Sequence, residues 1–168
     1  DLIKLFKYSI FFSLNVGIFS IAIQYTTAIM SQILYSLVPV IVVFLSYFFL
    51  KEKLTKQKII GLTIATVGVI ILLYNSATGQ EVLTFGTPFG NFLGLIAVFF
   101  WSCYLVFSKK LTDKYSVTTT SFASYAITVA ILLFFVPIEY FINPIGDISS
   151  SGIANILWLG IISSALMF

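Results

Sequence analysis

The chain alternates between long apolar runs and short polar or lysine-rich segments. The first long run, from Tyr8 to Leu50, contains no charged residue. As a single helix it would measure about 65 Å, whereas the hydrocarbon core of a bilayer is about 30 Å thick. The run must therefore fold back on itself, and we expect the turn in its polar cluster, residues 24–27.

The whole pattern predicts six membrane-spanning helices. A polar, turn-rich connection at residues 75–88 separates the third from the fourth, and Pro88 suits the first turn of the fourth helix. The sequence stops inside the sixth. The expected spans are residues 8–23, 28–50, 59–74, 88–107, 118–136 and 153 onward.

Composition places the chain among integral membrane proteins. Its residues are 60% hydrophobic, 17% aromatic and 9% charged, and its mean hydropathy is +1.09, far outside the range of soluble domains. The positive charge comes from lysine alone, without arginine or histidine, and does not indicate a nucleic-acid-binding protein. The single cysteine, Cys103, lies in an apolar run and can form neither an intrachain disulfide nor a metal cluster.

All the lysines fall on one side of the predicted bundle. They are Lys4, Lys7, Lys51, Lys53, Lys56, Lys58, Lys109, Lys110 and Lys114. The opposite connections carry Glu81, Glu139 and Asp147 and no positive charge. The positive-inside rule therefore predicts that the lysine-rich loops are cytoplasmic.

A short internal repeat links the first and last spans. Residues 14–25 and 157–168 share Leu, Gly, Ile, Ser and Ala at corresponding positions. The offset between the two copies covers an odd number of predicted spans, so the copies cross the membrane in opposite directions. Opposed copies are typical of inverted-repeat transporters, and we expect an inverted-repeat helical bundle.

The second span carries a polar stripe at helical spacing. Its members are Ser31, Gln32, Tyr35, Ser36, Pro39 and Ser46. Two interpretations stay open, because such a stripe either lines a substrate cavity or only forms hydrogen bonds between helices. Pro39 removes a backbone hydrogen bond near Tyr35 and predicts a kink, which is either a gating hinge or a packing feature.

Small residues predict two close helix contacts. The two faces are Gly86, Gly90 and Gly94, and Gly61, Ala65 and Gly68. Trp101 lies too deep in its span for an interfacial aromatic belt, and it either lines a cavity or packs against other helices.

The spans carry no recognisable catalytic chemistry. No charged residue or histidine lies well inside a span, and no nucleophile–base pair or metal-ligand spacing occurs. We therefore expect no enzyme, cofactor or metal here, and these residues give no basis for arguing proton coupling.

Two stretches carry a resemblance to a known family. Residues 22–73 read AIQYTTAIMSQILYSLVPVIVVFLSYFFLKEKLTKQKIIGLTIATVGVIILL, with a Tyr-Thr turn, Pro39 in the helix, Glu52 before Leu-Thr, and glycines in the next helix. Residues 90–111 read GNFLGLIAVFFWSCYLVFSKKL. In order and spacing the chain resembles the EamA-like family of the drug/metabolite transporter superfamily. One departure is Lys51, where the family more often has a small residue.

The resemblance implies ten helices in two inverted five-helix repeats, with both termini cytoplasmic. The chain, which opens on Asp1 and stops inside an apolar run, would be a fragment with helices three to eight. We expect residues 1–75 to be the C-terminal part of the first repeat and residues 76–88 an extracytoplasmic linker. Residues 89–168 would be the N-terminal part of the second, inverted repeat.

The resemblance also implies a function. We expect a secondary transporter of small polar metabolites, such as amino acids, working in efflux by alternating access in the bacterial cytoplasmic membrane. Its partners would be a small-molecule substrate and the lipid bilayer, with a homodimer as an open alternative. The competing hypothesis is a noncatalytic scaffold or assembly subunit of a membrane complex. The candidate cavity residues are Asn15, Ser20, Gln24, Ser31, Tyr35, Trp101, Tyr104 and Ser163, with Pro39 as the hinge.

Overall fold

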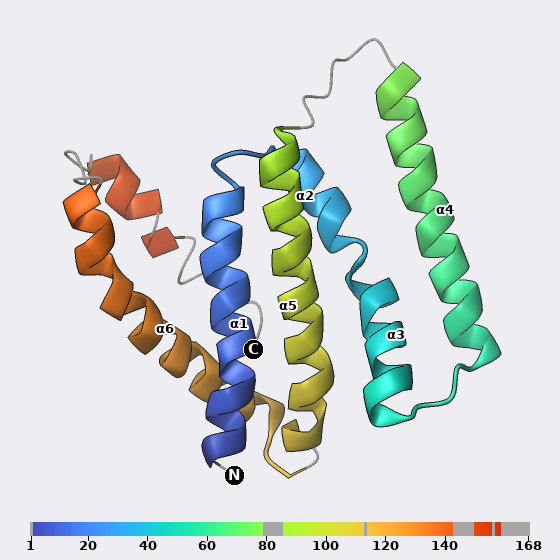
Figure 1. Ribbon diagram of the computed structural model, residues 1–168, viewed down its shortest axis with the longest axis horizontal. Helices are drawn as coiled ribbons and strands as arrows, with labels where there is room; N and C mark the ends of the chain where they lie inside the picture. Colours follow the sequence, from blue (N-terminus) through green and yellow to red (C-terminus); the bar gives the residue numbers. More distant parts are fainter. Residues whose placement is uncertain (1, 79–85, 113, 143–149, 156, 159–168) are drawn as a thin grey trace. The chain divides into compact units, whose positions relative to one another are not determined.

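The structure, a computed structural model, describes residues 2–78, 86–112, 114–142, 150–155 and 157–158. Of residues 2, 69, 70, 72–78 and 136–142 only the backbone is described. The described residues form helices and no strands, which confirms the all-α fold class. The helices (Figure 1) are α1 (Leu2–Ala22), α2 (Ala28–Tyr35), α3 (Val38–Leu50), α4 (Lys56–Thr78), α5 (Pro88–Thr112) and α6 (Val117–Ile142).

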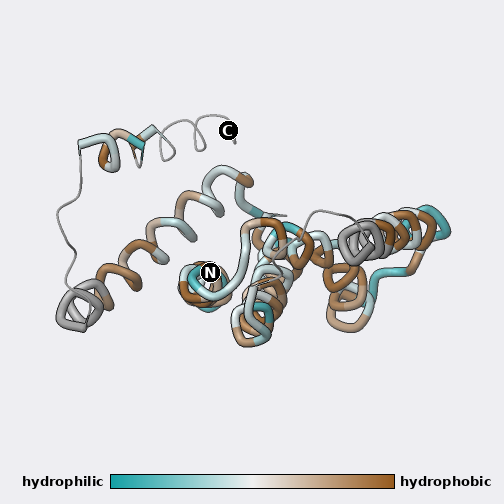
Figure 2. Tube along the Cα trace, turned by 90° about the horizontal axis from the view of Figure 1, so that it is seen from above, coloured by the Kyte–Doolittle hydropathy of each residue, from teal (hydrophilic) through white to brown (hydrophobic). Residues whose placement is uncertain are grey.

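The helices confirm a polytopic membrane protein. Apolar residues predominate along them in Figure 2. Among the described residues, four segments are long and apolar enough to cross a membrane, and they match the first, second, fourth and fifth predicted spans. The third predicted span is helical and lies within α4, for which some residues are described by their backbone alone. Most of the sixth predicted span lies outside the described residues. The four segments are Ile3–Ala22, Ala28–Leu50, Pro88–Thr112 and Val117–Phe135.

The chain divides into two compact units, Asp1–Thr128 and Val129–Phe168. The first unit contains α1 to α5 and the beginning of α6. All the contacts described below lie within this first unit.

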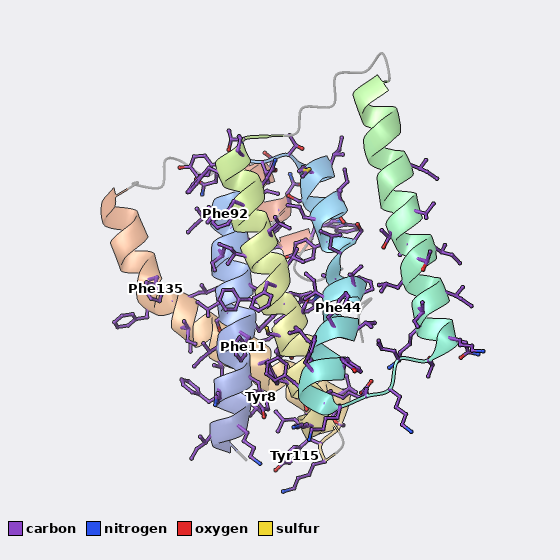
Figure 3. The ribbon with its side chains drawn as sticks, turned by 45° about the vertical axis from the view of Figure 1, so that its right-hand side comes forward. Tyr8, Phe11, Phe44, Phe92, Tyr115 and Phe135 are labelled. Carbon is purple, nitrogen blue, oxygen red and sulfur yellow. The ribbon has the colours of Figure 1, made fainter. Side chains whose placement is uncertain are left out.

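Helix α1 packs antiparallel along α5 through aromatic side chains (Figure 3). At the beginning of α1, the rings of Tyr8 and Phe11 lie 6.0 and 5.6 Å from the ring of Phe107. At the other end, the ring of Tyr25 meets that of Phe89 edge-on at 5.5 Å. Offset and edge-on ring pairs add to the stabilisation that burial provides.

The turn between α1 and α2 lies where the sequence predicts it. Thr27 caps α2, because its hydroxyl accepts a hydrogen bond from the Met30 backbone N–H at 3.2 Å. The beginning of α5 lies directly against this turn, since a Cβ on Gly90 would lie 2.5 Å from the Tyr25 carbonyl carbon. Close contacts are confirmed for all three predicted glycines, but Gly86, which precedes α5, and Gly90 meet this turn, and only Gly94 meets a helix, at Leu34 of α2.

The second small-residue face is not packed in the described part of the chain. An added Cβ on Gly61 or on Gly68 would meet no atom within 4 Å. The prediction of a close helix contact there is not met by any described helix.

Buried hydroxyls join α1 to the beginning of α6. Ser9 donates a hydrogen bond to the Ser124 hydroxyl at 3.1 Å, and the hydroxyls of Ser13 and Thr128 are hydrogen-bonded at 2.9 Å. In lipid, such bonds between helices typically contribute about 0.6 kcal/mol each. These two helices are therefore held together by polar contacts as well as by packing.

Candidate functional site

The second predicted span is interrupted near its middle. Helix α2 ends at Tyr35 and α3 begins at Val38, so Ser36 and Leu37 lie outside both helices. Both residues keep right-handed backbone angles, and the Ser36 and Leu37 N–H groups bond to carbonyls three residues earlier, as in a 3₁₀ turn. The interruption predicted from Pro39 is confirmed, but it lies before the proline, which occupies the first turn of α3.

Asn15 connects three helices beside this break. Its side-chain amide donates one hydrogen bond to the Tyr35 hydroxyl at 2.8 Å and another to the Ala97 carbonyl at 2.7 Å. Asn15 is only 5% exposed, and the ring of Phe19 packs edge-on against Tyr35. The structure therefore brings together two of the predicted cavity residues at the point where α2 ends.

Trp101 and Tyr104 form a second group, about one to two turns further along α5 than Ala97. Their rings lie 5.6 Å apart, and both pack against Phe12 of α1, at 5.6 and 5.2 Å. Tyr125 of α6 meets the same phenylalanine edge-on at 5.0 Å. In this arrangement the two candidates are packing aromatics between α1, α5 and α6.

The remaining candidates are spread over the first unit. Ser20 and Gln24 are exposed near the end of α1 and bond to backbone carbonyls of the same helix. Ser31 is 3% exposed, and its hydroxyl has no hydrogen-bond partner among the described atoms. Ser163 lies outside the described residues. That these residues line one substrate cavity stays a prediction.

The structure contains a cavity of about 390 Å³ between α3, α4 and α5. Apolar side chains from all three helices form most of its wall, while Ser46 and Gln57 add polar groups. Of the residues singled out as cavity or hinge, only Pro39 lines it. The apolar wall residues are Val42, Val43, Leu62, Leu105 and Val106.

One end of this cavity carries a three-residue ion cluster. Glu52 accepts a hydrogen bond from Lys58 at 2.8 Å and a second, short one from Lys109. These bonds, first from Lys109 and then from Lys58, lower the pKa of the Glu52 carboxyl from 4.5 to about 2. The Glu52 carboxyl therefore stays ionised at neutral pH, and its bonds connect the loop after α3 to both α4 and α5.

The loop that carries Glu52 has defined ends. Lys51 takes a left-handed conformation (φ 55°), and its N–H donates to the Ser46 carbonyl. Glycine is usual at such a position, which gives a physical reason for the small residue of the family pattern. At the other end, the Thr55 hydroxyl accepts a hydrogen bond from the Lys58 N–H at 3.3 Å and caps α4.

Apart from Pro39 and Ser46 of the polar stripe, sequence reasoning assigned no site role to the residues of the ion cluster or the cavity wall. Glu52 and Lys109 lie in the two stretches that resemble the family, but they are far apart in the sequence. The available signal was a charged residue at the end of each of two spans. This signal predicts that Glu52 and Lys109 lie close together only if the ends of α3 and α5 are known to be neighbours.

The profile of the EamA-like transporter family matches residues 1–74 and 88–168. An uncharacterized transporter of Bacillus subtilis, YetK, is 34% identical over 122 residues, which cover 71% of this chain and 35% of that protein. An uncharacterized transporter of Acidianus ambivalens is 26% identical over 166 residues, 98% of this chain and 60% of that protein.

A shorter match reaches a protein with a more specific name. A "Probable amino-acid metabolite efflux pump" of Salmonella typhimurium is 33% identical over 67 residues, 40% of this chain and 21% of that protein. No solved structure matches the chain significantly. The chain spans less than two thirds of the length of these relatives. Since the family profile covers most of its residues, the chain belongs to the EamA-like transporter family.

Proposed function

We propose that the chain is part of a secondary transporter that exports small polar metabolites by alternating access around a central cavity. Membership of a transporter family supports the transport role. In this proposal the chain is not an enzyme and needs no cofactor, and the bilayer and the substrate are its partners.

The helix break beside Asn15 is the observation that carries the proposal. Helices α2 and α3 have 8 and 13 residues, so the break lies about 12 Å from one end of the span and about 20 Å from the other. Interrupted helices at such depth are tolerated where protein or cavity water covers the backbone. Transporters commonly place substrate sites at such interruptions. The Asn15 amide and the Tyr35 hydroxyl would then exchange their mutual hydrogen bond for bonds to a polar solute.

The distribution of lysine supports an orientation. The beginning of α1 lies beside the end of α5, and the loop after α3 is bonded to that same end. We place this lysine-rich end in the cytoplasm and the protein in a bacterial cytoplasmic membrane. The complete protein would have ten helices in two inverted repeats, with residues 1–75 and 89–168 in different repeats and residues 76–88 as the linker.

The substrate class and the direction of transport rest on the Salmonella relative. Its name specifies an amino-acid metabolite and efflux, and the similarity covers 40% of this chain. The absence of charged residues well inside the spans favours neutral or zwitterionic solutes over strongly anionic ones.

The proposal is tested by transport in liposomes containing the complete protein, with a panel of labelled amino acids and related metabolites. Pro39→Ala allows the helix to continue through Ser36 and Leu37, so we expect flux to fall several-fold while the unfolding midpoint changes little. Pro88→Ala is the matched control, because Pro88 begins α5, which is not part of the break. Its flux should equal that of the parent protein.

The scaffold hypothesis predicts a different outcome. In that case no compound exchanges, and substitutions of Asn15 or Tyr35 change stability alone. The role of the helix break in transport would be refuted if Pro39→Ala and Pro88→Ala both gave the same flux as the parent protein.

A further inference from the structure

The cavity between α3, α4 and α5 shares Pro39 with the proposed transport site. Its wall includes Val42 of α3, Leu62 of α4 and Val106 of α5. Asn15 and Tyr35 do not line it, so the transport proposal gives the cavity no part in binding the solute. Its volume, about 390 Å³, falls in the range of about 300–1,000 Å³ that is usual for ligand sites.

The cavity stays open because its wall on α4 has little bulk. Gly61 lines the cavity, and a Cβ at this position would meet no atom within 4 Å. The apolar part of this space lies at membrane depth, where the bilayer core supplies no water. Hydrocarbon is therefore the expected filling of its apolar part.

The charged end has a net positive charge. Lys58 and Lys109 converge on the single carboxylate of Glu52, and these three are the charged residues that line the cavity. The two lysine side chains remain 41% and 57% exposed, so an anion can approach them from water. A ligand with one negative group would complement this end.

The apolar part lies deeper in the membrane than the charged end. Helix α3 ends at Leu50, and Val42 lies about 12 Å back along its axis. The last turn of α5 carries Lys109 at the same end. The site thus suits a molecule with an anionic group at the membrane surface and a hydrocarbon chain in the bilayer.

We infer that this cavity binds an anionic phospholipid from the leaflet on the lysine-rich side. The phosphate lies beside Lys58 and Lys109, and an acyl chain lies against Val42 and Leu62. Basic pockets between membrane helices recognise lipid headgroups in this way, and the lysine ammonium binds phosphate as a point charge. Glu52 competes with the phosphate for both lysines and weakens the site.

The experiment is native mass spectrometry of the complete protein in detergent, titrated with phosphatidylglycerol or with phosphatidylcholine. Phosphatidylglycerol should bind more tightly, and Lys58→Gln with Lys109→Gln should weaken it by about five-fold for each lysine removed. The matched control is Lys53→Gln with Lys110→Gln, because both lysines are exposed at the same end of the helices and outside the cavity wall. Its affinity for phosphatidylglycerol should stay unchanged.

Two further variants separate lipid binding from loss of structure. Glu52→Gln breaks both ion pairs but removes the competing charge, so it should increase the affinity for phosphatidylglycerol. Gly61→Phe keeps all three charged residues and fills the cavity, so it should decrease that affinity.

Several results would overturn the inference. The first is equal binding of phosphatidylglycerol and phosphatidylcholine. The second is an equal loss of affinity in the Lys58/Lys109 variant and in the Lys53/Lys110 control. The third is a loss of affinity in Glu52→Gln as large as that in the lysine variants. Displacement of the lipid by soluble glycerol phosphate at the same concentration would instead indicate a site for soluble anions, and would also refute a lipid site. Lipid binding is measured without a transported solute, so these outcomes leave the proposed transport function unaffected.

Discussion

Replacing Gly90 by alanine should destabilise the protein, because the new methyl group has no room. It would lie 2.5 and 2.6 Å from the carbonyl carbon and oxygen of Tyr25 and 2.8 Å from the backbone nitrogen of Thr26. These are backbone atoms, so no side-chain rotation relieves the overlap. The turn is held in place because Thr87 donates two hydrogen bonds of 2.8 Å to the Tyr25 carbonyl, from its N–H and its hydroxyl. Thr26 also donates a hydrogen bond of 2.6 Å to the side-chain oxygen of Asn91.

The expected cost follows from these contacts. Overpacking of this kind usually costs about 1–3 kcal/mol, and each interhelical hydrogen bond that is lost adds about 0.6 kcal/mol. The higher helix propensity of alanine offsets at most about 1 kcal/mol. We therefore expect Gly90→Ala to lower the free energy of unfolding by about 2 kcal/mol.

The measurement is equilibrium unfolding of the complete protein in one detergent, with Gly61→Ala as the matched control. An added Cβ on Gly61 meets no atom within 4 Å, so this variant should be as stable as the parent or slightly more stable. If the two variants unfold at the same midpoint, the close approach of α5 to the turn between α1 and α2 is wrong.

Three other predictions concern single contacts. Asn15→Leu and Tyr35→Phe should each destabilise the protein, because each removes one partner of their hydrogen bond. A double-mutant cycle of unfolding free energies should give a coupling of about 0.6–1.7 kcal/mol. A coupling of zero would contradict the hydrogen bond. Lys51→Gly should raise the unfolding free energy by about 1 kcal/mol, because it relieves a left-handed backbone conformation, whereas the control Lys53→Gly should not. The Glu52 carboxyl has a pKa of about 2 in the folded protein, against an ordinary value of 4.5. The stability that the Glu52 ion pairs contribute is therefore fully present above pH 4.5 and is lost as the pH falls toward 2. Between these two pH values, thermal unfolding should show that the parent protein loses about 1 kcal/mol of stability relative to the Glu52→Gln variant. If the stabilities of the two proteins change in parallel with pH, the ion cluster is contradicted.

Most of the helices were predictable because a membrane imposes a length on every apolar run. The turn before α2 followed from the only polar cluster in a run without charges, and Thr27 caps the helix there. The contacts of Gly90 and Gly94 followed from their spacing on one face of α5. Each of these features depends on local sequence and on the bilayer alone.

The exact place of the helix break was harder to predict. Pro39 indicated a kink, but the break lies at Ser36 and Leu37, and the proline begins the next helix. A proline clashes with the carbonyl four residues earlier and leaves its own position compatible with a first turn. The disturbance therefore falls before the proline.

The pairing of polar residues could not be predicted from one sequence. Asn15 and Tyr35 were both candidates, but their hydrogen bond depends on how α1 and α2 are rotated about their axes. Trp101 belongs to the same candidate set and lies instead against Phe12. The cluster around Glu52 depends on α3, α4 and α5 meeting at one end, which no local pattern specifies.

The break between α2 and α3 also has a consequence for biogenesis. Neither helix alone, at about 12 and 20 Å, spans the hydrocarbon core of about 30 Å, so the translocon must recognise Ala28–Leu50 as one 23-residue segment. Asn15 bonds to the Ala97 carbonyl, which is synthesised much later than α1 and α2. We therefore expect the nascent span to enter the bilayer before the contacts at its break are complete, and these contacts to form only when α5 arrives.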